Sequence, residues 1–288
     1  MIGHSHARIA MTRWTRVFVL IGRQLLLVPE ALFLLLVLCL HMGPGIPPVT
    51  TLPALGLIGW FVTRFLLICM ARRALDQARY LGAARLIRVA LWLYPYSADA
   101  RALQGMIALA QGDAETAVAE LRQAIMFYPG HAGLHATRSG ALLEVGQTVE
   151  ACWEAMHALA LDPNCAPAYL HLANGGQALG APRALIEAHL RRGLQAATAP
   201  IDEAALCCTL AALLLEAERS VEAQLVLVGI EGLLVHGSVP QQAALHYYLG
   251  ELRRTIGDSD GARDHFSVSE TLDPHGRYAA AAWRAARL

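Results

Sequence analysis

The sequence contains no lysine, and all 23 of its basic residues are arginine. This absence excludes enzymes that form a Schiff base through a lysine and ATPases whose phosphate loop needs one. Charge is also scarce, because 16% of the residues are charged and the formal net charge is zero, whereas 56% are hydrophobic. So apolar a chain favours a buried core over disorder, and so neutral a chain lacks the basic surface that nucleic acid requires. We therefore expect no nucleic-acid partner.

Paired cysteines are missing as well. The chain has six cysteines with no CxxC pair, and the adjacent Cys207 and Cys208 cannot easily bridge each other. We expect reduced thiols that pack as small apolar side chains in a cytoplasmic setting; a zinc site is the alternative, which the spacing disfavours. The other cysteines are Cys39, Cys69, Cys152 and Cys165.

Two long apolar runs stand near the start of the chain, at residues 25–42 and 51–70. Each is long enough to cross about 30 Å of hydrocarbon as a helix, and the Gly- and Pro-rich connector between them supplies a turn. A cleaved signal peptide fits the first run less well, because the run is too long and a second follows at once. We predict an N-terminal segment over 1–24 and a transmembrane helical hairpin over 25–70.

Arginine placement orients this hairpin. Arginines flank both outer ends of the hairpin, whereas the connector carries none, so the positive-inside rule predicts that both termini are cytoplasmic. Alanine- and arginine-rich composition without lysine is typical of GC-rich bacterial genomes, which predicts the bacterial inner membrane. The flanking residues are Arg8, Arg13, Arg16 and Arg23 before the first run and Arg72, Arg73 and Arg79 after the second.

Two charged residues, Glu30 and Arg64, lie inside the predicted spans. Each costs at least ~2.5 kcal/mol at the membrane centre if isolated. At 1.5 Å per residue both sit at a similar depth, roughly 8 to 9 Å from the cytoplasmic edge. One hypothesis is that they pair across the hairpin, or that one pairs with another membrane subunit; the alternative is that each reaches the interface alone.

A 34-residue period runs through the rest of the chain. Pro95, Pro129 and Pro163 are 34 residues apart, and two further columns keep the same step. Because several columns share one period, the prediction is an array of structural repeats. These columns are Ala90, Ala124 and Ala158, and Gly112, Gly146 and Gly180.

This period, with small residues where helices cross and a closing proline, resembles the tetratricopeptide repeat (TPR) superfamily. In the unit 98–131, Gly105, Ala117 and Ala124 occupy the small positions and Pro129 closes the unit. The resemblance implies an all-α fold in which pairs of antiparallel helices stack into an α-solenoid. The further units are 132–165, 166–200, 201–239, which keeps the helical periodicity but loses the repeat motif, and a last one ending at Pro274.

The boundaries follow from this resemblance. We predict a solenoid of about five to six repeats over 64–275 and a C-terminal capping helix over 276–288. The first helix of the first unit then overlaps the second apolar run. One continuous helix over about 53–79 would therefore pass from the membrane into the solenoid without a linker.

The TPR resemblance also implies a partner-binding groove built from the first helix of each unit. Because the groove residues Met106 and Leu109 are apolar, the interhelical core is their alternative. A lysine-based clamp on a terminal carboxylate is excluded by the absence of lysine. The residues at the family's groove-facing positions are Ala102, Met106, Leu109, Leu170, Asn174, Gln177, Tyr247, Glu251 and Arg254.

Several histidines have spacings found among metal ligands. His131 and His135 are four residues apart, and Glu154 and His157 have the Glu-x-x-His spacing of di-iron bundles, but no second copy of that motif occurs. We interpret them as helix-surface or groove residues. His4 and His6 form only a weak pair near the N-terminus. We predict neither a cofactor nor a metal, and, without a nucleophile motif or phosphate loop, no enzyme.

The layout predicts a membrane-anchored scaffold that recruits membrane-embedded and cytoplasmic protein partners. Two membrane helices followed by cytoplasmic TPRs resemble the E subunit of the Pel exopolysaccharide secretion machinery, which implies a role in assembling the biofilm-matrix synthase. One alternative is a periplasm-facing chaperone resembling cytochrome c maturation factors. A membrane proteostasis adaptor is another, although the cysteine-bound metal module of such proteins is missing. An enzyme or metal protein remains a third alternative, supported only by the scattered histidines.

Overall fold

The computed structural model describes residues 51–287, with side chains from residue 55. This part of the chain is helical throughout and contains no strand. The predictions for the segment 1–24, the first span and the connector lie outside the described residues, as do Glu30 and the N-terminal histidines. The chain divides after Leu66 into two units, and the repeats belong to the unit that begins at Leu67.

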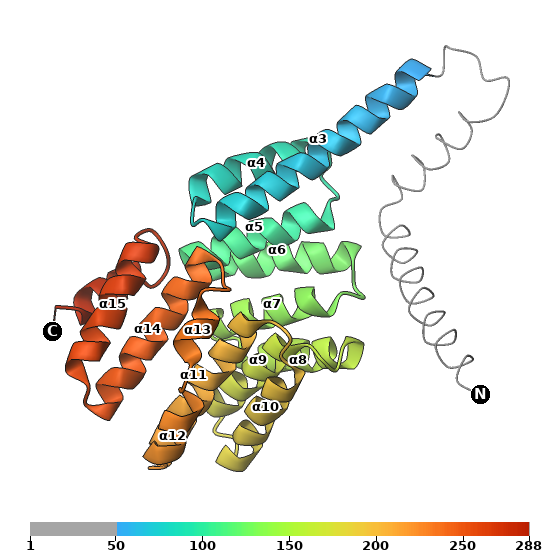
Figure 1. The fold of residues 1–288 in the computed structure, drawn as a ribbon. Helices are drawn as coiled ribbons and strands as arrows, with labels where there is room; N and C mark the ends of the chain where they lie inside the picture. Colours follow the sequence, from blue (N-terminus) through green and yellow to red (C-terminus); the bar gives the residue numbers. More distant parts are fainter. Residues whose placement is uncertain (1–50, 288) are drawn as a thin grey trace, which may run out of the picture. The chain divides into compact units, whose positions relative to one another are not determined.

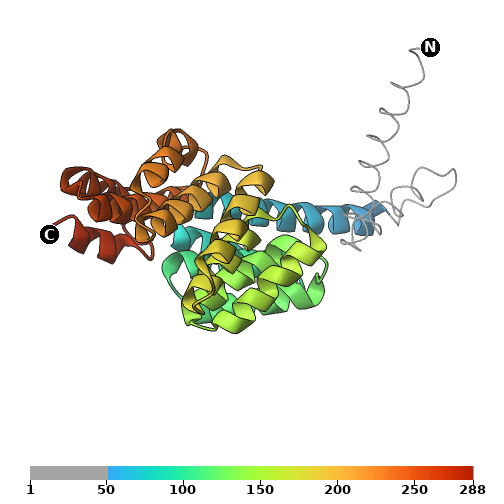
Figure 2. The ribbon, with the colours of Figure 1, turned by 90° about the horizontal axis from the view of Figure 1, so that it is seen from below.

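Successive helices of the repeats pack as antiparallel pairs that follow one another along the chain (Figures 1 and 2). The helices are α3 (Thr51–Asp76), α4 (Tyr80–Leu93), α5 (Ala98–Gln111), α6 (Ala114–Phe127), α7 (Ala132–Val145), α8 (Thr148–Leu161), α9 (Ala166–Ala178), α10 (Arg183–Ala196), α11 (Pro200–Glu216), α12 (Ser220–Val226), α13 (Ile230–Leu234), α14 (Val239–Ile256), α15 (Ser259–Leu272) and α16 (Ala279–Ala285).

The helix ends explain the 34-residue spacing of the glycines. Gly112 and Gly146 end α5 and α7 in the left-handed conformation, with φ of 86° and 83°, which glycine adopts without a steric penalty. Asp113 then begins α6 by accepting a hydrogen bond from the backbone N–H of Thr116. The glycine therefore stops the first helix of a repeat and allows the chain to reverse.

Small residues allow the two helices of a repeat to approach closely, as predicted. A Cβ atom at Gly105 would lie 2.8 Å from Cγ of Leu121 and 3.2 Å from the carbonyl oxygen of Ala117. The last repeat has the same arrangement, since a Cβ at Gly250 would lie 2.6 Å from the ring of Phe266. Side chains larger than hydrogen at these positions would push the helices apart.

Helix α3 is continuous from Thr51 to Asp76, which confirms the predicted uninterrupted helix. Its segment Leu55–Asp76 is the one stretch among the described residues that is long and apolar enough to cross a membrane. Of the 18 most apolar consecutive residues in this segment, 11% are buried. The helix ends before residue 79 because Ala78 adopts a left-handed conformation with φ of 56°. Just before that turn, Ala71 and Leu75 of α3 share a hydrophobic core with residues of α4 and α5.

The unit 201–239 departs from the simple helix pair. Helix α11 is followed by two short helices, α12 and α13, because Gly229 takes a left-handed φ of 78° between them. The core is nevertheless well filled there, since Leu206, Leu210 and Leu214 of α11 are fully buried. The broken second helix explains why the repeat motif loses its register in the sequence.

Within the range 276–288, for which we predict a C-terminal capping helix, the structure has α16 over Ala279–Ala285, and the residues before it form a turn. That turn contacts the first repeats through Arg277. The end of the array is therefore covered by more than a solvent-facing helix.

Candidate partner-binding cavity

A cavity of about 370 Å³ lies on the inner face of the solenoid, where residues from the first and last repeats meet. This size falls within the range of small-ligand pockets. Its wall mixes apolar groups with titratable and hydrogen-bonding side chains. The lining residues are Arg72, Leu75, Asp76, Met106, Leu109, Ala110, Thr137, Gly140, Pro167, His171, Asp202, Ser238, Pro240, Gln241, Ala243, Ala244, Ser269, Asp273, Arg277 and Tyr278.

The predicted groove residues are distributed over several environments. Met106 and Leu109 line the cavity wall. Ala102 and Asn174 are half-buried outside it, and Leu170 packs against the largest core cluster. The structure therefore brings only part of the predicted set into one site.

The remaining predicted groove residues contact neighbouring helices or one another. Gln177 is exposed and donates a hydrogen bond of 3.1 Å to Glu216. Tyr247 packs on Phe266, with 5.6 Å between the ring centroids. Glu251 and Arg254 form an ion pair one turn apart on α14. These four predicted groove residues lie outside the cavity wall.

Residues 273–278, which connect α15 to α16, contact helices of the first repeats. We call them the closing segment. The Tyr80 hydroxyl, on α4, donates a hydrogen bond to Asp273. The backbone N–H of Arg277 donates to the Ala110 carbonyl at 3.1 Å, and its guanidinium lies 2.9 Å from Glu144. Repeats that are far apart in sequence are thus joined directly.

An aromatic cluster holds the other end of the closing segment. Tyr278 stacks on Tyr247, with ring centroids 5.0 Å apart, and its hydroxyl lies 2.5 Å from that of Tyr248. The guanidinium of Arg277 lies over the Tyr278 ring, 4.4 Å from its centroid. Stacking and hydrogen bonding together fix the segment to α14. Because the sequence motif ends at Pro274, the period alone did not indicate this cluster.

His171 is the cavity residue whose imidazole is held neutral by its surroundings. Burial, together with the positive charge of Arg277, lowers the pKa of His171 to about 4. The ring therefore carries no charge at pH 7. Gly140 provides the space for it, because a Cβ there would lie 2.9 Å from Cε1 of the ring.

Two carboxyl groups of the cavity are also perturbed. Burial raises the pKa of Asp202 and of Asp273 from the ordinary value of an aspartate carboxyl group. Oδ2 of Asp273 accepts the hydrogen bond from Tyr80, whereas Oδ1 is buried without a partner among the described residues. The wall thus combines a neutral imidazole, carboxyl groups and the guanidinium of Arg277 beside apolar surface. This combination can hydrogen-bond a polar segment while packing apolar side chains.

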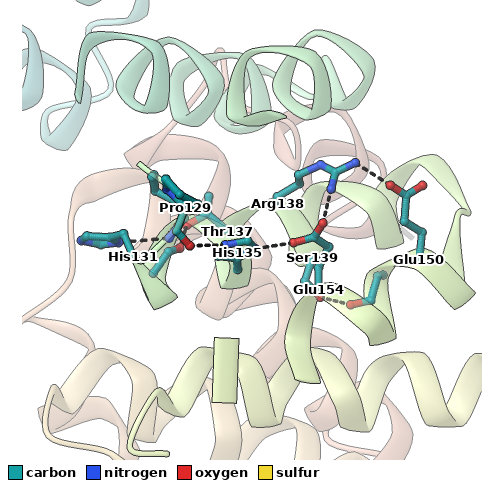
Figure 3. Close-up of polar contacts among 11 residues, drawn as sticks. Pro129, His131, His135, Thr137, Arg138, Ser139, Glu150 and Glu154 are labelled. Atoms are coloured by element: carbon teal, nitrogen blue, oxygen red, sulfur yellow. Dashed lines mark hydrogen bonds and ion pairs between the residues drawn. The ribbon is translucent and has the colours of Figure 1, made fainter. Parts of the chain in front are cut away.

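The histidine motif that resembles a metal site is a structural network between α7 and α8 (Figure 3). His135 is buried, with Nδ1 2.6 Å from Glu154 and Nε2 2.9 Å from the Pro129 carbonyl oxygen. The two contacts tie His135 of α7 to a carboxylate of α8 and to the loop before α7. Arg138 pairs with Glu154 and with Glu150.

The interpretation of these histidines as helix-surface or groove residues does not hold for His135, which is buried where α7 and α8 meet. The centroid of the His157 ring lies 4.4 Å from the centroid of the His135 ring. His131 caps α7 by accepting a hydrogen bond from the backbone N–H of Leu134. No group of three or more metal-binding side chains converges anywhere in the described residues.

Comparison with solved structures shows which fold this arrangement represents. The Pseudomonas aeruginosa protein PilF superposes with a TM-score of 0.52 at 19% identity, over 78% of this chain and 99% of PilF. PilW, a widely conserved type IV pilus biogenesis factor, gives 0.53 at 18% identity over 76% and 98% of the two chains. The TPR protein TTC0263 of Thermus thermophilus gives 0.50 at 18% identity over 71% and 98%.

The described repeats have the TPR fold. Neither the protein-family models nor the curated proteins gave a match to this chain. At these identities the structural likeness shows the TPR fold alone.

Proposed function

We propose that this chain is a non-catalytic TPR adaptor of a bacterial inner membrane, with its repeats in the cytoplasm, and that its inner cavity holds a segment of a protein partner. The observation that supports anchoring is the character of α3. Leu55, Phe65 and Met70 are 63%, 57% and 56% exposed along one uninterrupted helix. A soluble protein would bury such a helix, whereas lipid accommodates it without cost.

The length of α3 supports the same proposal. Its 26 residues extend roughly 39 Å at 1.5 Å per residue, which exceeds the hydrocarbon thickness of about 30 Å. Its cytoplasmic end, from Ala71, packs in the first repeat. The same helix therefore serves as membrane anchor and as the first repeat helix. The proposed charge pair between Glu30 and Arg64 would belong to this anchor, where the Arg64 guanidinium lies 5.5 Å from the centroid of the Trp60 ring.

The cavity supports an adaptor role. TPR arrays bind partner segments on their inner faces, and this inner face offers apolar wall beside hydrogen-bonding groups. Partners of both kinds, membrane-embedded and cytoplasmic, are reachable from such a position. The Pel-type exopolysaccharide synthase complex, with its glycosyltransferase and cyclic-di-GMP receptor subunits, is the specific assembly we propose.

Site-specific photo-crosslinking in the native membrane tests the adaptor role. A benzophenone amino acid at position 106, in the cavity wall, should crosslink to a subunit of the complex. The matched control is position 228, where Val228 is 77% exposed and lies outside the cavity. Equal crosslinking at the two positions, or no crosslink to either synthase subunit, would contradict the role proposed for the cavity.

Topology is tested separately. A fluorescent protein fused after Leu288 should be fluorescent and alkaline phosphatase at the same position inactive, because the C-terminus is proposed to be cytoplasmic. Active phosphatase would instead favour the periplasm-facing alternative. Release of the chain from membranes by alkaline carbonate would contradict anchoring itself.

A further inference from the structure

A set of arginines near the start of the solenoid differs from most arginines of the later repeats. Arginines at 101, 138, 191, 219, 253, 254, 263, 277 and 287 each form an ion pair. In contrast, Arg73, Arg79, Arg85 and Arg88 are exposed and form no ion pair with any residue of the described part. The first repeat thus presents positive charge that the described residues do not neutralise.

Helix α4 combines this charge with exposed apolar side chains. Trp92 is 80% exposed, Leu81 is 74% exposed and Val89 is 47% exposed, although α4 buries its opposite face in the core of the first repeat. Arg85, Arg88, Val89 and Trp92 line one shallow depression of the surface. The helix contains no acidic residue. One face of α4 is therefore both cationic and apolar.

The position of this face points to its occupant. A short turn after Asp76 reverses the chain, so α4 runs back along α3 and shares a core with Leu67 and Ile68. The last turn of α4 therefore lies at the end of the first repeat where α3 enters that repeat. Tyr96 follows with 65% exposure and packs edge-on against Phe127, with ring centroids 5.7 Å apart. Trp and Tyr favour the membrane interface, and arginine favours anionic headgroups.

We infer that the outer face of α4 is a binding surface for anionic phospholipid headgroups. The inference rests on the proposed membrane anchoring and adds a second lipid contact. The arginines neutralise phosphate, while Trp92 and Val89 enter the interfacial layer. This contact limits how far the first repeat can tilt away from the bilayer. A protein covering the same face would bring acidic side chains, and the experiment separates this case from lipid.

Photo-crosslinking of the full-length chain in nanodiscs tests the inference. A benzophenone amino acid is placed at position 92, at position 62 in α3, or at position 225, where Leu225 is 66% exposed on α12. The nanodiscs contain phosphatidylcholine and phosphatidylglycerol, and adducts are identified by mass spectrometry. We expect lipid adducts at positions 62 and 92 and none at 225, with phosphatidylglycerol enriched at position 92.

The outcomes separate the inference from the proposed function. Lipid adducts at 62 without lipid adducts at 92 overturn the α4 contact and leave the anchor intact. No lipid adduct at 62 overturns the anchoring and with it the inference. Adducts at 92 to a second protein chain show that a protein covers α4, which also overturns the inference.

A charge-matched pair of variants tests the role of the arginines. Replacing Arg85 and Arg88 together by glutamine should lower the ratio of phosphatidylglycerol to phosphatidylcholine adducts at position 92 roughly five-fold or more. The reason is that one arginine near an anionic surface strengthens binding to that surface roughly five-fold. The control replaces Arg183 and Arg192, two exposed arginines of α10, by glutamine. An equal decrease in both double variants would overturn headgroup recognition by α4.

Discussion

Single residues decide how closely the helices pack and how the cavity titrates. Gly250 leaves the space that the Phe266 ring fills, as Gly105 does for Leu121. His171 is a base kept neutral by its surroundings. The two cases share a cause. The interior is packed so closely that adding one methyl group or one proton raises the free energy of the folded state.

Gly250→Ala is expected to destabilise the fold by about 1 to 3 kcal/mol, because the new methyl group would overlap a buried aromatic ring. Gly82→Ala is the matched control, since a Cβ there meets nothing within 4 Å and alanine favours the helix by roughly 0.5 to 1 kcal/mol. Urea unfolding followed by circular dichroism measures both. Equal effects of the two substitutions would show that the crossing at Gly250 is not tight.

His171 predicts a pH dependence of stability. Its folded-state pKa of about 4 lies below the unfolded value of about 6.5, so the unfolded chain binds the proton first as the pH falls. Stability is therefore lost between about pH 6.5 and pH 4, by up to about 3 kcal/mol from this residue. His171→Gln should flatten the stability profile in that window, whereas His236→Gln, at an exposed position, should not. Parallel profiles for wild type and His171→Gln would contradict the prediction.

Pairs of helices are held together by polar contacts as well as by packing. The network of His135, Arg138 and Glu154 joins α7 to α8, and the buried Ser139 hydroxyl donates to the Ala151 carbonyl on the facing helix at 2.7 Å. Polar groups buried at a helix interface specify one alignment, because any shift leaves them unsatisfied. This repeat has its interhelical register fixed by specific bonds.

Glu154→Gln tests this network. The substitution removes the negative charge that faces both His135 and Arg138, so we expect a loss of about 1 to 3 kcal/mol. Glu150→Gln is the control, because Glu150 pairs with the same arginine but its side chain is 49% exposed, and such pairs contribute about 0 to 1 kcal/mol. Thermal unfolding with calorimetric enthalpies measures the difference. A control as damaging as Glu154→Gln would refute a special role for the half-buried pair of Arg138 and Glu154.

At the scale of the whole array, the closing segment links the last repeat to the first ones. Tyr80 and Asp273 are 193 residues apart in sequence and share a hydrogen bond. TPR arrays consist mainly of contacts between neighbouring repeats, so each end can fray independently. A link between distant repeats couples them and defines the cavity that we propose as the partner site.

Arg277→Ala should loosen this link, because it removes the ion pair with Glu144 and the cation–π contact with Tyr278. Hydrogen–deuterium exchange should become faster at the end of α5 and in the closing segment. Arg263→Ala is the control, since Arg263 forms an exposed ion pair with Asp260 one turn away on α15. Unchanged exchange in Arg277→Ala would show that packing alone closes the array.

The sequence alone determined the helix pairs, the tight crossing at Gly105 and the continuous passage of α3 into the first repeat. Those features are local or periodic: a glycine or proline acts within its own repeat, and the 34-residue step copies the result. The split between α12 and α13 escaped prediction because that unit lacks the repeat motif.

Only the tertiary structure decided which side chains meet across the array. Met106 was predictable as a first-helix residue on the inner face, but Asp202 and His171 join it in one cavity because rotations accumulate from repeat to repeat. The pairing of Tyr80 with Asp273 depends on the same accumulated rotation. The 34-residue period specifies neighbouring contacts and carries no information on where distant repeats return to meet.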